Sequence, residues 1–533
     1  MLKGRKYLIL VCSIILLSIM IIYFCIHKMS KTNGEHYDLV IYGGGLQAVA
    51  TALNASDVTK RNSSILIVVP ERYLGSILTA GGQNLFDVRE YKVSKLPKGL
   101  PSYYPYPQGG NMYTFMKEPS IVFSPTYMAS YLLELTKLHP NIDILFEYDI
   151  AEVQTNSSKD KISSIKVFPL IKDQHSRYIF DEERPIVVHS EHFVDASETG
   201  RFISLSGLFN GVVGRGDIDK DEKQMAAGLM IKVKNINMEA VQKKKKEMAP
   251  FLIYYSHKNS LGILGGYEIN EDNEFKKYSD QNQYFRIKPY NGGEDGYTGK
   301  WKQSEETEMW MNMLLIYDVD ARKSWRDKVY NNGNYPENHL LDPEIAREMA
   351  IKEISSEGFI QLLRRLPGLS NVTLVYEDHE PVVGDILYIR ESIHSTNPDG
   401  SFALNKEAVS KTGNDRRYYD RRVGLGYYNF DSNSYEKGES LSEGRPKEPW
   451  YVPYDVLLSP NVSNLLIPGY AANMDSYTFR AMRVYPNLVV LGDAAGVAMG
   501  LSLLGEFNLK HPTKEQMQLL QTELSKRNVI LDK

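Results

Sequence analysis

The chain has 533 residues, of which 42% are hydrophobic and 24% are charged, and its formal net charge is -4. At about 150 residues per domain, this length predicts about two to four folded units rather than one core. Because nucleic-acid binding normally needs a basic face, the slightly acidic balance argues against a nucleic-acid partner.

An uncharged apolar run, residues 7–26, reads YLILVCSIILLSIMIIYFCI. At about 1.5 Å per residue, a helix of this length crosses roughly the 30 Å core of a bilayer. The run exceeds the apolar part of a signal peptide, about 7 to 15 residues, and no small-residue cleavage site follows it. We therefore expect residues 1–33 to form an uncleaved membrane anchor with one transmembrane helix.

The flanking charges and the cysteines bear on which side of the membrane the body of the protein lies, the body being the part of the chain that follows the predicted anchor. Three basic residues precede the apolar run and two follow it closely. This small excess favours a cytoplasmic N-terminus and an extracytoplasmic body, and the reverse orientation stays open. Both cysteines, Cys12 and Cys25, lie within the run. The body therefore has no thiol for a disulfide, a CxxC redox pair or a cysteine nucleophile.

The stretch DLVIYGGGLQAVATAL, residues 38–53, joins a buried-strand pattern to a helix pattern through three glycines. The turn has the dinucleotide-binding form G-x-G-x-x-A. Gly43 permits the tight turn, Gly45 lets the backbone approach a pyrophosphate, and Ala48 lets the helix pack closely on the strand. The free N–H groups and the positive end of the helix then favour phosphate.

A second buried-strand pattern, SILIVV at residues 64–69, is followed closely by Glu71. An acid at this strand end would bind the ribose hydroxyls of a dinucleotide. Glu71 lies 26 residues after Gly45, whereas the usual spacing is about 20. An ordinary exposed loop acid is the alternative.

A related pattern closes the chain, at residues 464–502. Two apolar runs, 465–468 and 488–491, flank a polar segment, and the second run ends in GDAAG before an apolar helix. We read this as strand, small-residue turn and helix, with Gly492 and Gly496 giving a bound ring close access. Asp493 would accept hydrogen bonds from a ribityl or ribose hydroxyl, or act as a helix N-cap.

These motifs resemble those of the FAD-dependent oxidoreductases with a glutathione-reductase-like flavin fold. Five landmarks occur in the family's order: residues 38–53, 74–87 (LGSILTAGGQNLFD), 193–208 (FVDASETGRFISLSGL), 385–395 (DILYIRESIHS) and 464–502. The resemblance implies an FAD cofactor, with its pyrophosphate at Gly43, Gly45 and Ala48. It also implies that Gly492, Asp493 and Gly496 lie near the ribityl chain and the flavin.

Three departures from the family pattern concern cofactor binding. Val69 stands where the family carries its ribose-binding acid, so either Glu71 substitutes or ribose binding is weaker. Ser76 replaces the second glycine of the usual pair, and the segment around Glu198 is a loose version of the family's motif.

We therefore predict an α/β fold: a discontinuous Rossmann-like FAD-binding domain with an inserted α+β substrate domain, preceded by the transmembrane helix. The FAD domain is assigned residues 36–95, 140–212 and 458–530. The substrate domain is assigned residues 96–139 and 213–457, where polar, Tyr-rich segments with Gly-rich turns predominate.

Three residues are candidates for catalysis beside the flavin. Arg390 could hold an anionic substrate group or stabilise a reduced flavin, and Arg483 is a second cation that could reach the ring. His394, four residues from Arg390, is the candidate base. The alternative places the arginines in ordinary ion pairs and His394 in a surface loop. No metal site is expected, because His189 and His192 would point to opposite faces of a strand.

The function predicted from the sequence is a membrane-anchored FAD-dependent oxidoreductase that transfers a hydride or an electron pair between a small substrate and flavin. Its electron acceptor would be oxygen, a quinone or a partner protein, because only one G-x-G-x-x-A turn is present. The alternative is a non-catalytic surface binding protein that retains the fold, with altered contacts at Val69, Ser76 and Glu198.

Overall fold

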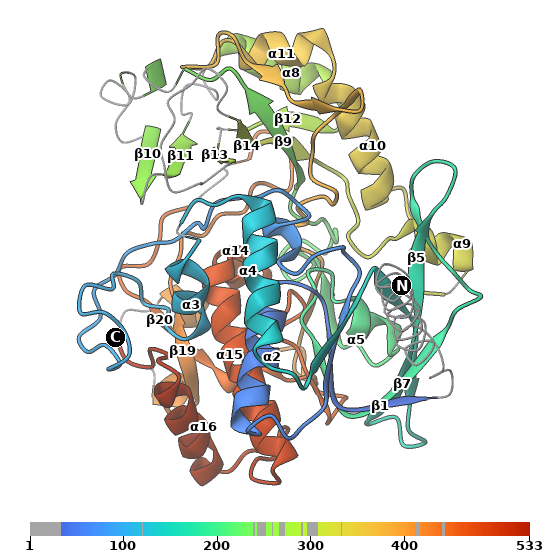
Figure 1. The fold of residues 1–533 in the computed structure, drawn as a ribbon, viewed down its shortest axis with the longest axis vertical. Coiled ribbons are helices and arrows are strands. Elements are labelled where there is room, and N and C mark those ends of the chain that lie inside the picture. The colour runs from blue at the N-terminus through green and yellow to red at the C-terminus, as the bar shows by residue number, and fades with distance from the viewer. Residues whose placement is uncertain are drawn as a thin grey trace, which may run out of the picture.

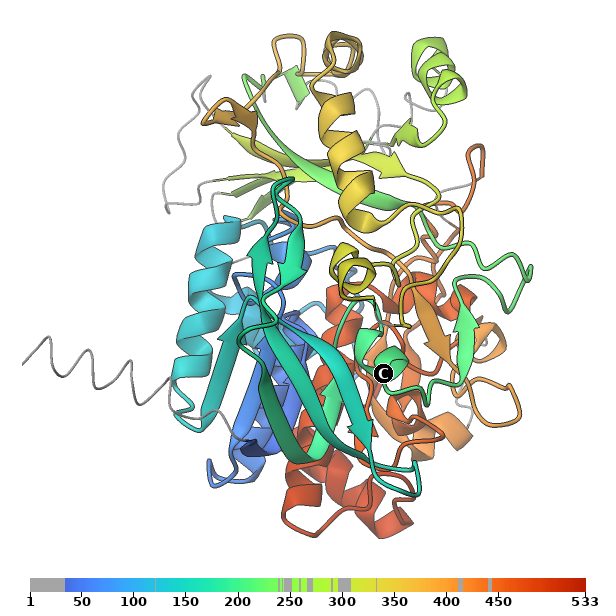
Figure 2. The ribbon, with the colours of Figure 1, turned by 90° about the vertical axis from the view of Figure 1, so that its right-hand side faces the viewer.

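The computed structural model of the protein describes residues 34–119, 121–237, 240–241, 243, 252–257, 260–265, 272–288, 291–295, 308–331, 333–410, 416–439 and 443–533. The predicted anchor, residues 1–33, lies outside the described residues. Figures 1 and 2 show two stacked parts. The lower part combines both ends of the described chain, and the upper part is built from its middle.

The lower part is organised by a sheet with strand order β3-β2-β1-β7-β5-β4. Its strands are β1 (Glu35–Tyr42), β2 (Ile65–Val69), β3 (Ile142–Phe146), β4 (Tyr148–Thr155), β5 (Ile162–Lys172) and β7 (Ile186–Asp195), with β6 (Tyr178–Phe180) and β21 (Leu465–Leu466) on the branches. Strands β3, β2, β1 and β7 run parallel, whereas β5 and β4 are antiparallel additions. The apolar runs of β1 and β2 suit parallel strands that are covered on both faces.

Helix α2 (Leu46–Val58) follows β1 and packs against α15 (Tyr485–Leu503) (Figure 1). The predicted strand at residues 488–491 is wrong, because these residues belong to the 19-residue helix α15. A short apolar run cannot distinguish a strand from a buried helix, and here the apolar pattern continues far beyond strand length. Pro486 lies in the first turn of α15, where its fixed φ suits a helix start.

Three glycines of α15, spaced four residues apart, let it approach α2 closely. A Cβ atom at Gly492 would lie 2.4 Å from the Gln47 carbonyl oxygen, and one at Gly496 would lie 2.4 Å from that of Thr51. At Gly500 it would lie 2.6 Å from the Val58 side chain. The GDAAG segment is therefore a helix-packing surface within α15.

Residues 96–139 belong to the lower part, not to the substrate side as predicted. They contain α3 (Asn111–Lys117) and α4 (Pro125–Lys137). The buried side chains of these two helices join the same core cluster as α2 and α15. This placement could not be predicted from the sequence, because an amphipathic helix does not reveal which partner covers its apolar face. The hairpin of β19 (Arg422–Gly426) and β20 (Trp450–Pro453) also joins this core.

The upper part has its own sheet and its own core. The sheet comprises β9 (Ala227–Lys234), β10 (Leu252–His257), β11 (Ser260–Gly265), β12 (Phe285–Ile287), β13 (Asn291–Glu294), β14 (Met309–Ile316) and β15 (Thr373–Leu374). Helices α8 (Asn273–Gln281), α10 (Pro343–Ile354) and α11 (Glu357–Leu363) pack above it (Figure 2). This part, with α9 (Trp325–Tyr330), forms a cap over the lower domain.

Two short strands join the parts, β8 (Gly211–Val213) and β18 (Ile393–Ser395), which pair antiparallel. The remaining short elements are η1 (Ser76–Leu78), α5 (Arg201–Leu205), β16 (Tyr376–Glu377), β17 (Glu380–Pro381), α12 (Lys406–Ser410), α13 (Arg416–Asp420), η2 (Tyr454–Leu457), α14 (Ser476–Met482) and α16 (Lys514–Lys526). Of the helices in the described residues, α15 alone has the length and hydropathy of a membrane span, and it is buried in the core of the protein.

Candidate active site

The glycine turn between β1 and α2 leaves no room for side chains of its own, and the Gln47 side chain lies against Gly45, where a Cβ atom would be 2.6 Å from Gln47 Oε1. Gly43 has φ +110°, and a Cβ atom there would lie 2.9 Å from the carbonyl group of Ala196. At Gly44 it would lie 2.7 Å from Val69 Cγ1. Because the first-turn N–H groups of α2 have no acceptor within the helix, they and the positive helix end favour an anion here. Ala48 is fully buried at this end of α2.

Two acidic side chains lie beside the turn. Glu71 follows β2, and its Oε2 is buried without a hydrogen-bond partner. Glu198 follows β7, and its Oε1 accepts a hydrogen bond of 3.2 Å from the Tyr485 hydroxyl. Burial, reinforced by the negative charge of Glu198, raises the pKa of Glu71 to about 8. An unpartnered carboxylate at this position is suited to accept hydrogen bonds from a ribose.

A cavity of 440 Å³ extends from these acids towards the cap. Its lining includes Glu71, Ser76, Glu198, Arg201 and Arg326. The volume falls within the range of about 300–1,000 Å³ that is usual for cofactor and ligand pockets. The two acids beside the glycine turn, Glu71 and Glu198, therefore line a space large enough for a dinucleotide fragment.

The segment after β2 docks on the glycine turn. Gly75 N donates a hydrogen bond of 2.7 Å to the Gly44 carbonyl oxygen. Gly75 has φ +105°, and Ser76 has φ +44°. A left-handed conformation costs a residue with a Cβ roughly 1–2 kcal/mol, whereas glycine adopts it freely. The departure from the usual glycine pair therefore leaves Ser76 in a conformation that glycine would adopt without strain.

The C-terminal candidates lie mainly on the flank of α2. Gly496 contacts the middle of that helix, and Gly492 packs against its first turn. Asp493 accepts hydrogen bonds from the side-chain amides of Asn54, at 2.8 Å, and Asn111, at 2.7 Å. It also accepts one from the backbone N–H of Asn111 at the start of α3. Burial, opposed by these bonds, raises the pKa of Asp493 to about 7. Its contacts thus tie three helices together, and neither Asp493 nor Gly496 lines the cavity.

A second, smaller pocket of 30 Å³ lies between the lower domain and the cap. Arg390 and Arg483 both line it, and both are buried. Tyr388 joins them: the Arg390 guanidinium lies 4.4 Å from the centre of its ring, and Arg483 Nη1 donates a hydrogen bond of 3.0 Å to its hydroxyl. Gly228 makes room for Arg390, since a Cβ atom there would lie 2.7 Å from Nη2.

Lys288, which directly follows β12, adds a third basic group to this pocket. Its Nζ donates a hydrogen bond of 3.1 Å to Asn433 Oδ1. Burial, together with the positive charge of Arg390, lowers the pKa of Lys288 to about 7. A lysine with this pKa exists in part as a neutral amine near neutral pH, so it can accept a proton.

His394 lies in a different environment from the one predicted. Its side chain is fully buried, Nε2 lies 3.0 Å from Glu391 Oε1, and its ring packs edge-on against Phe479. It lines neither of the two pockets described above. The geometry therefore gives His394 a structural role beside Glu391, and Lys288 is better placed as the base.

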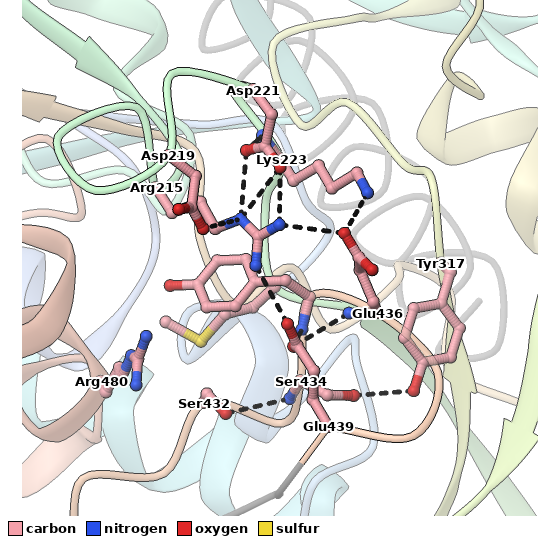
Figure 3. A network of polar contacts seen from close by, with 12 residues as sticks. Arg215, Asp219, Asp221, Lys223, Tyr317, Ser432, Ser434, Glu436, Glu439 and Arg480 are labelled. Atoms are coloured by element: carbon pink, nitrogen blue, oxygen red, sulfur yellow. Dashed lines mark hydrogen bonds and ion pairs between the residues drawn. The ribbon is translucent and has the colours of Figure 1, made fainter.

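A charged network surrounds Arg215, close in the chain to the pocket residue Asn433 (Figure 3). Arg215 forms ion pairs with Asp221 at 2.6 Å, and with Glu436 and Glu439 at 3.0 Å each. These pairs fix the loop that carries Asn433 onto the segment leading into β9. Since four carboxylates, including Asp219, already surround Arg215, this cluster holds its loop and is not a ligand site (Figure 3).

The two pockets meet at Tyr485. This residue lines the smaller pocket, and its hydroxyl donates to Glu198, which lines the larger cavity. Tyr485 is also the first residue of α15, so its position depends on the packing of that helix against α2. The hydrogen bond between Tyr485 and Glu198 thus connects the wall of the small pocket with the wall of the large cavity.

Comparison with known proteins places these observations in a family. Residues 38–521 match the family described as FAD dependent oxidoreductase. The chain belongs to this family. None of the curated proteins compared with it matches the chain.

Solved structures with detectable similarity to this FAD-dependent oxidoreductase have low identities. The myxobacterial chondrochloren halogenase CndH has 12% identity and a TM-score of 0.31, with 69% of this chain and 67% of that chain covered. The p-nitrophenol 4-monooxygenase PnpA from Pseudomonas putida DLL-E4 has 11% identity and a TM-score of 0.28, with 68% of this chain and 74% of that chain covered. L-amino acid deaminase from Proteus myxofaciens has 10% identity and a TM-score of 0.31, with 90% of this chain and 92% of that chain covered. 

The residues present in the oxidoreductase fit its FAD cofactor. The glycine turn precedes the N-terminus of α2, where glycines alone fit the close packing, and the unpartnered Glu71 Oε2 is available to a ribose hydroxyl. That Glu71 substitutes for the acid absent at Val69 stays a prediction. Val69 is the last residue of β2 and lies beneath Gly44.

Several residues of the small pocket had no signal in the sequence. Lys288, Asn312 and Asp431 come from separate segments, and no motif links them. Tyr388 lies in the recognised segment 385–395, but nothing in the sequence distinguished it there as a pocket residue. Arg390 and Arg483 were found because they neighbour recognisable segments. Only the packing of the cap onto the lower domain brings all of these side chains together.

Proposed function

We propose that this FAD-dependent oxidoreductase is membrane-anchored and transfers a hydride or an electron pair between flavin and a small substrate bound in the small pocket between the domains. The observation that supports this most directly is the contact of that pocket with the cofactor cavity through Tyr485 and Glu198. Bound FAD supplies the two-electron chemistry. The protein supplies positioning, charge and proton transfer.

Each group in the small pocket has a distinct part in such a reaction. Arg390 and Arg483 orient the substrate and stabilise negative charge that develops beside the cofactor. In an oxidation, Lys288 Nζ accepts the proton that a substrate hydroxyl or amine loses as the hydride leaves its carbon. Burial between the two domains excludes water from the reacting atoms.

The absorption spectrum of the full-length protein in detergent is the first test. We expect flavin bands in the wild type and their loss in Gly44→Val, whose side chain would collide with Val69 and Glu71. Gly444→Val is the matched control, because nothing lies within 4 Å of a Cβ atom there. A folded wild-type protein without flavin, before and after incubation with FAD, would overturn the proposal and favour the binding-protein alternative.

The electron acceptor can be distinguished with the same preparation. After anaerobic reduction of the flavin with dithionite, its reoxidation is followed in the presence of oxygen or of a water-soluble quinone. Rapid reoxidation by oxygen indicates an oxidase, and rapid reoxidation by the quinone alone indicates electron transfer towards the membrane. If neither reoxidises the flavin, a partner protein is the acceptor.

The proposed anchor is residues 7–26, with the body on the extracytoplasmic side. The basic residues before this run support that orientation. Protease added to intact cells should degrade the body and leave the N-terminus protected. Protection of the body in intact cells, with digestion after lysis, would instead indicate a cytoplasmic enzyme.

A further inference from the structure

Three basic side chains from separate parts of the chain meet in the small pocket between the domains. Lys288 follows β12, Arg390 lies on the segment before β18, and Arg483 directly follows α14. Arg390 is 1% exposed and Arg483 is 3% exposed. Lysine and arginine side chains are almost never buried to this extent without paired charges. Their partners therefore decide what the pocket can bind.

Arg390 has polar hydrogen-bond partners but no ion-pair partner among the described residues. Its Nη1 donates 2.7 Å to the Ala226 carbonyl oxygen, and its Nη2 donates 3.0 Å to Asn312 Oδ1. Its Nε is buried without a partner. Within the part of the chain that the structure describes, no carboxylate oxygen lies within 4.0 Å of this guanidinium. Burial, and the nearby positive charge of Arg483, lower the pKa of Arg390 to about 10.

Arg483 is only partly compensated. Its Nη2 lies 3.5 Å from Asp431 Oδ2 and also donates to the Asp431 carbonyl oxygen. Its Nε, like that of Arg390, is buried without a partner. Two buried guanidinium groups that share one pocket therefore each retain an unused donor.

The acids that face the pocket do not balance these cations. Asp87 forms an ion pair with Arg89 and accepts a hydrogen bond from the Tyr428 hydroxyl, so its charge is already matched. Asp431 then faces Lys288, Arg390 and Arg483. Burying unpaired positive charge is costly, so an excess of this kind points to an anion supplied by a ligand.

We propose that the substrate of this enzyme carries a carboxylate or a similarly small oxyanion, which is held between Arg390 and Arg483 in the pocket between the domains. This inference rests on the proposed function and names the class of substrate for the same site. A planar guanidinium matches a carboxylate through paired N–H donors, and low dielectric strengthens such charge-assisted bonds. The 30 Å³ of space admits the anionic group only, so the rest of the substrate extends beyond the pocket.

The test uses the flavin-containing full-length enzyme and three small probes. Acetate, acetamide and chloride are titrated separately while the flavin absorption spectrum and the melting temperature are recorded. We expect acetate to give a saturable spectral change and a rise in melting temperature. Acetamide has nearly the same size without the charge, and should bind at least about tenfold more weakly. Chloride controls for ionic strength.

Variants locate the binding site within the enzyme. Arg390→Met and Arg483→Met should each weaken acetate binding at least about tenfold. Arg480→Met is the matched control, since Arg480 lies on α14 and pairs with Glu443 at 3.0 Å, outside the pocket. It should bind acetate as the wild type does. If an arginine variant fails to fold, Lys288→Met and the wild-type comparison of acetate with acetamide decide the question.

The outcomes separate this inference from the proposed function. An enzyme without flavin contradicts the proposed function itself. An enzyme that holds flavin but responds equally to acetate and acetamide, or to acetate and chloride, overturns the anionic-substrate inference and leaves the oxidoreductase function standing. Unchanged acetate binding in both arginine variants would also overturn the inference.

Discussion

The substitution Gly496→Ala tests whether the GDAAG segment packs a helix or lines the cofactor. The new Cβ atom would lie 2.4 Å from the Thr51 carbonyl oxygen and 2.9 Å from Asn54 Cβ. Ordinary contact begins at about 3.4 Å, so α15 would have to move roughly 1 Å away from α2. The first neighbour is helix backbone and cannot swing aside. Overpacking of this kind costs about 1–3 kcal/mol, and we expect the upper part of that range.

The assay is thermal unfolding of the full-length protein, together with its flavin content below the transition. At about 2–4 °C per kcal/mol, Gly496→Ala should lower the apparent melting temperature by at least about 4 °C. Gly358→Ala is the control, because it makes the same change in α11 where a Cβ atom would meet nothing within 4 Å. It should be neutral, or stabilise by about 0.5–1 kcal/mol. Wild-type stability with lost flavin in Gly496→Ala would refute the helix-packing argument.

Three further predictions concern the cofactor domain. Ser76→Gly should relieve the strain at φ +44°. After the entropic cost of glycine, the free energy of unfolding should rise by about 0.5–1 kcal/mol, and the melting temperature should rise with it. A lower melting temperature would mean that the serine hydroxyl contributes more to stability than the backbone strain costs. The folded-state pKa of Glu71 is raised from 4.5 to about 8, so the folded protein binds this proton more tightly than the unfolded chain. The free energy of unfolding of the cofactor-free protein should therefore fall as pH rises from about 4.5 to about 8, and should fall less in Glu71→Gln. Urea unfolding at several pH values measures this, and an equal slope of unfolding free energy against pH in both proteins would contradict it. Asp493→Asn places an amide where three N–H donors converge. It should lower the free energy of unfolding in urea by about 1–3 kcal/mol and leave the flavin affinity unchanged. Weaker flavin binding at wild-type stability would instead make Asp493 a cofactor ligand.

The sequence alone determined the start of the FAD domain. A run of apolar residues, a glycine turn and an alanine-rich helix can form little else, since only glycine adopts φ +110° readily and only small residues permit the close contact. The strand before Glu71 was equally clear. Residues 141–153 alternate in the manner of a strand, and in the structure they form two strands, β3 and β4, because the chain turns at Glu147, which has φ +56°.

Tertiary structure decided what local patterns left ambiguous. The apolar residues 488–491 taken by themselves fit a strand or a buried helix equally well, and in the structure they belong to a 19-residue helix that packs against α2. Whether α3 and α4 covered the cap or the lower domain depended on packing partners far away in the chain.

The catalytic pocket shows the same division. The sequence identified Arg390 and Arg483 as cations near recognisable segments, but it could not place Lys288 beside them or bury His394 away from both pockets. A lysine acquires a pKa of about 7 only through its surroundings, here burial and the charge of Arg390. Sequence therefore determined the backbone geometry that holds the cofactor, whereas the charge and the proton chemistry of the pocket arise from side chains that meet only when the two domains fold together.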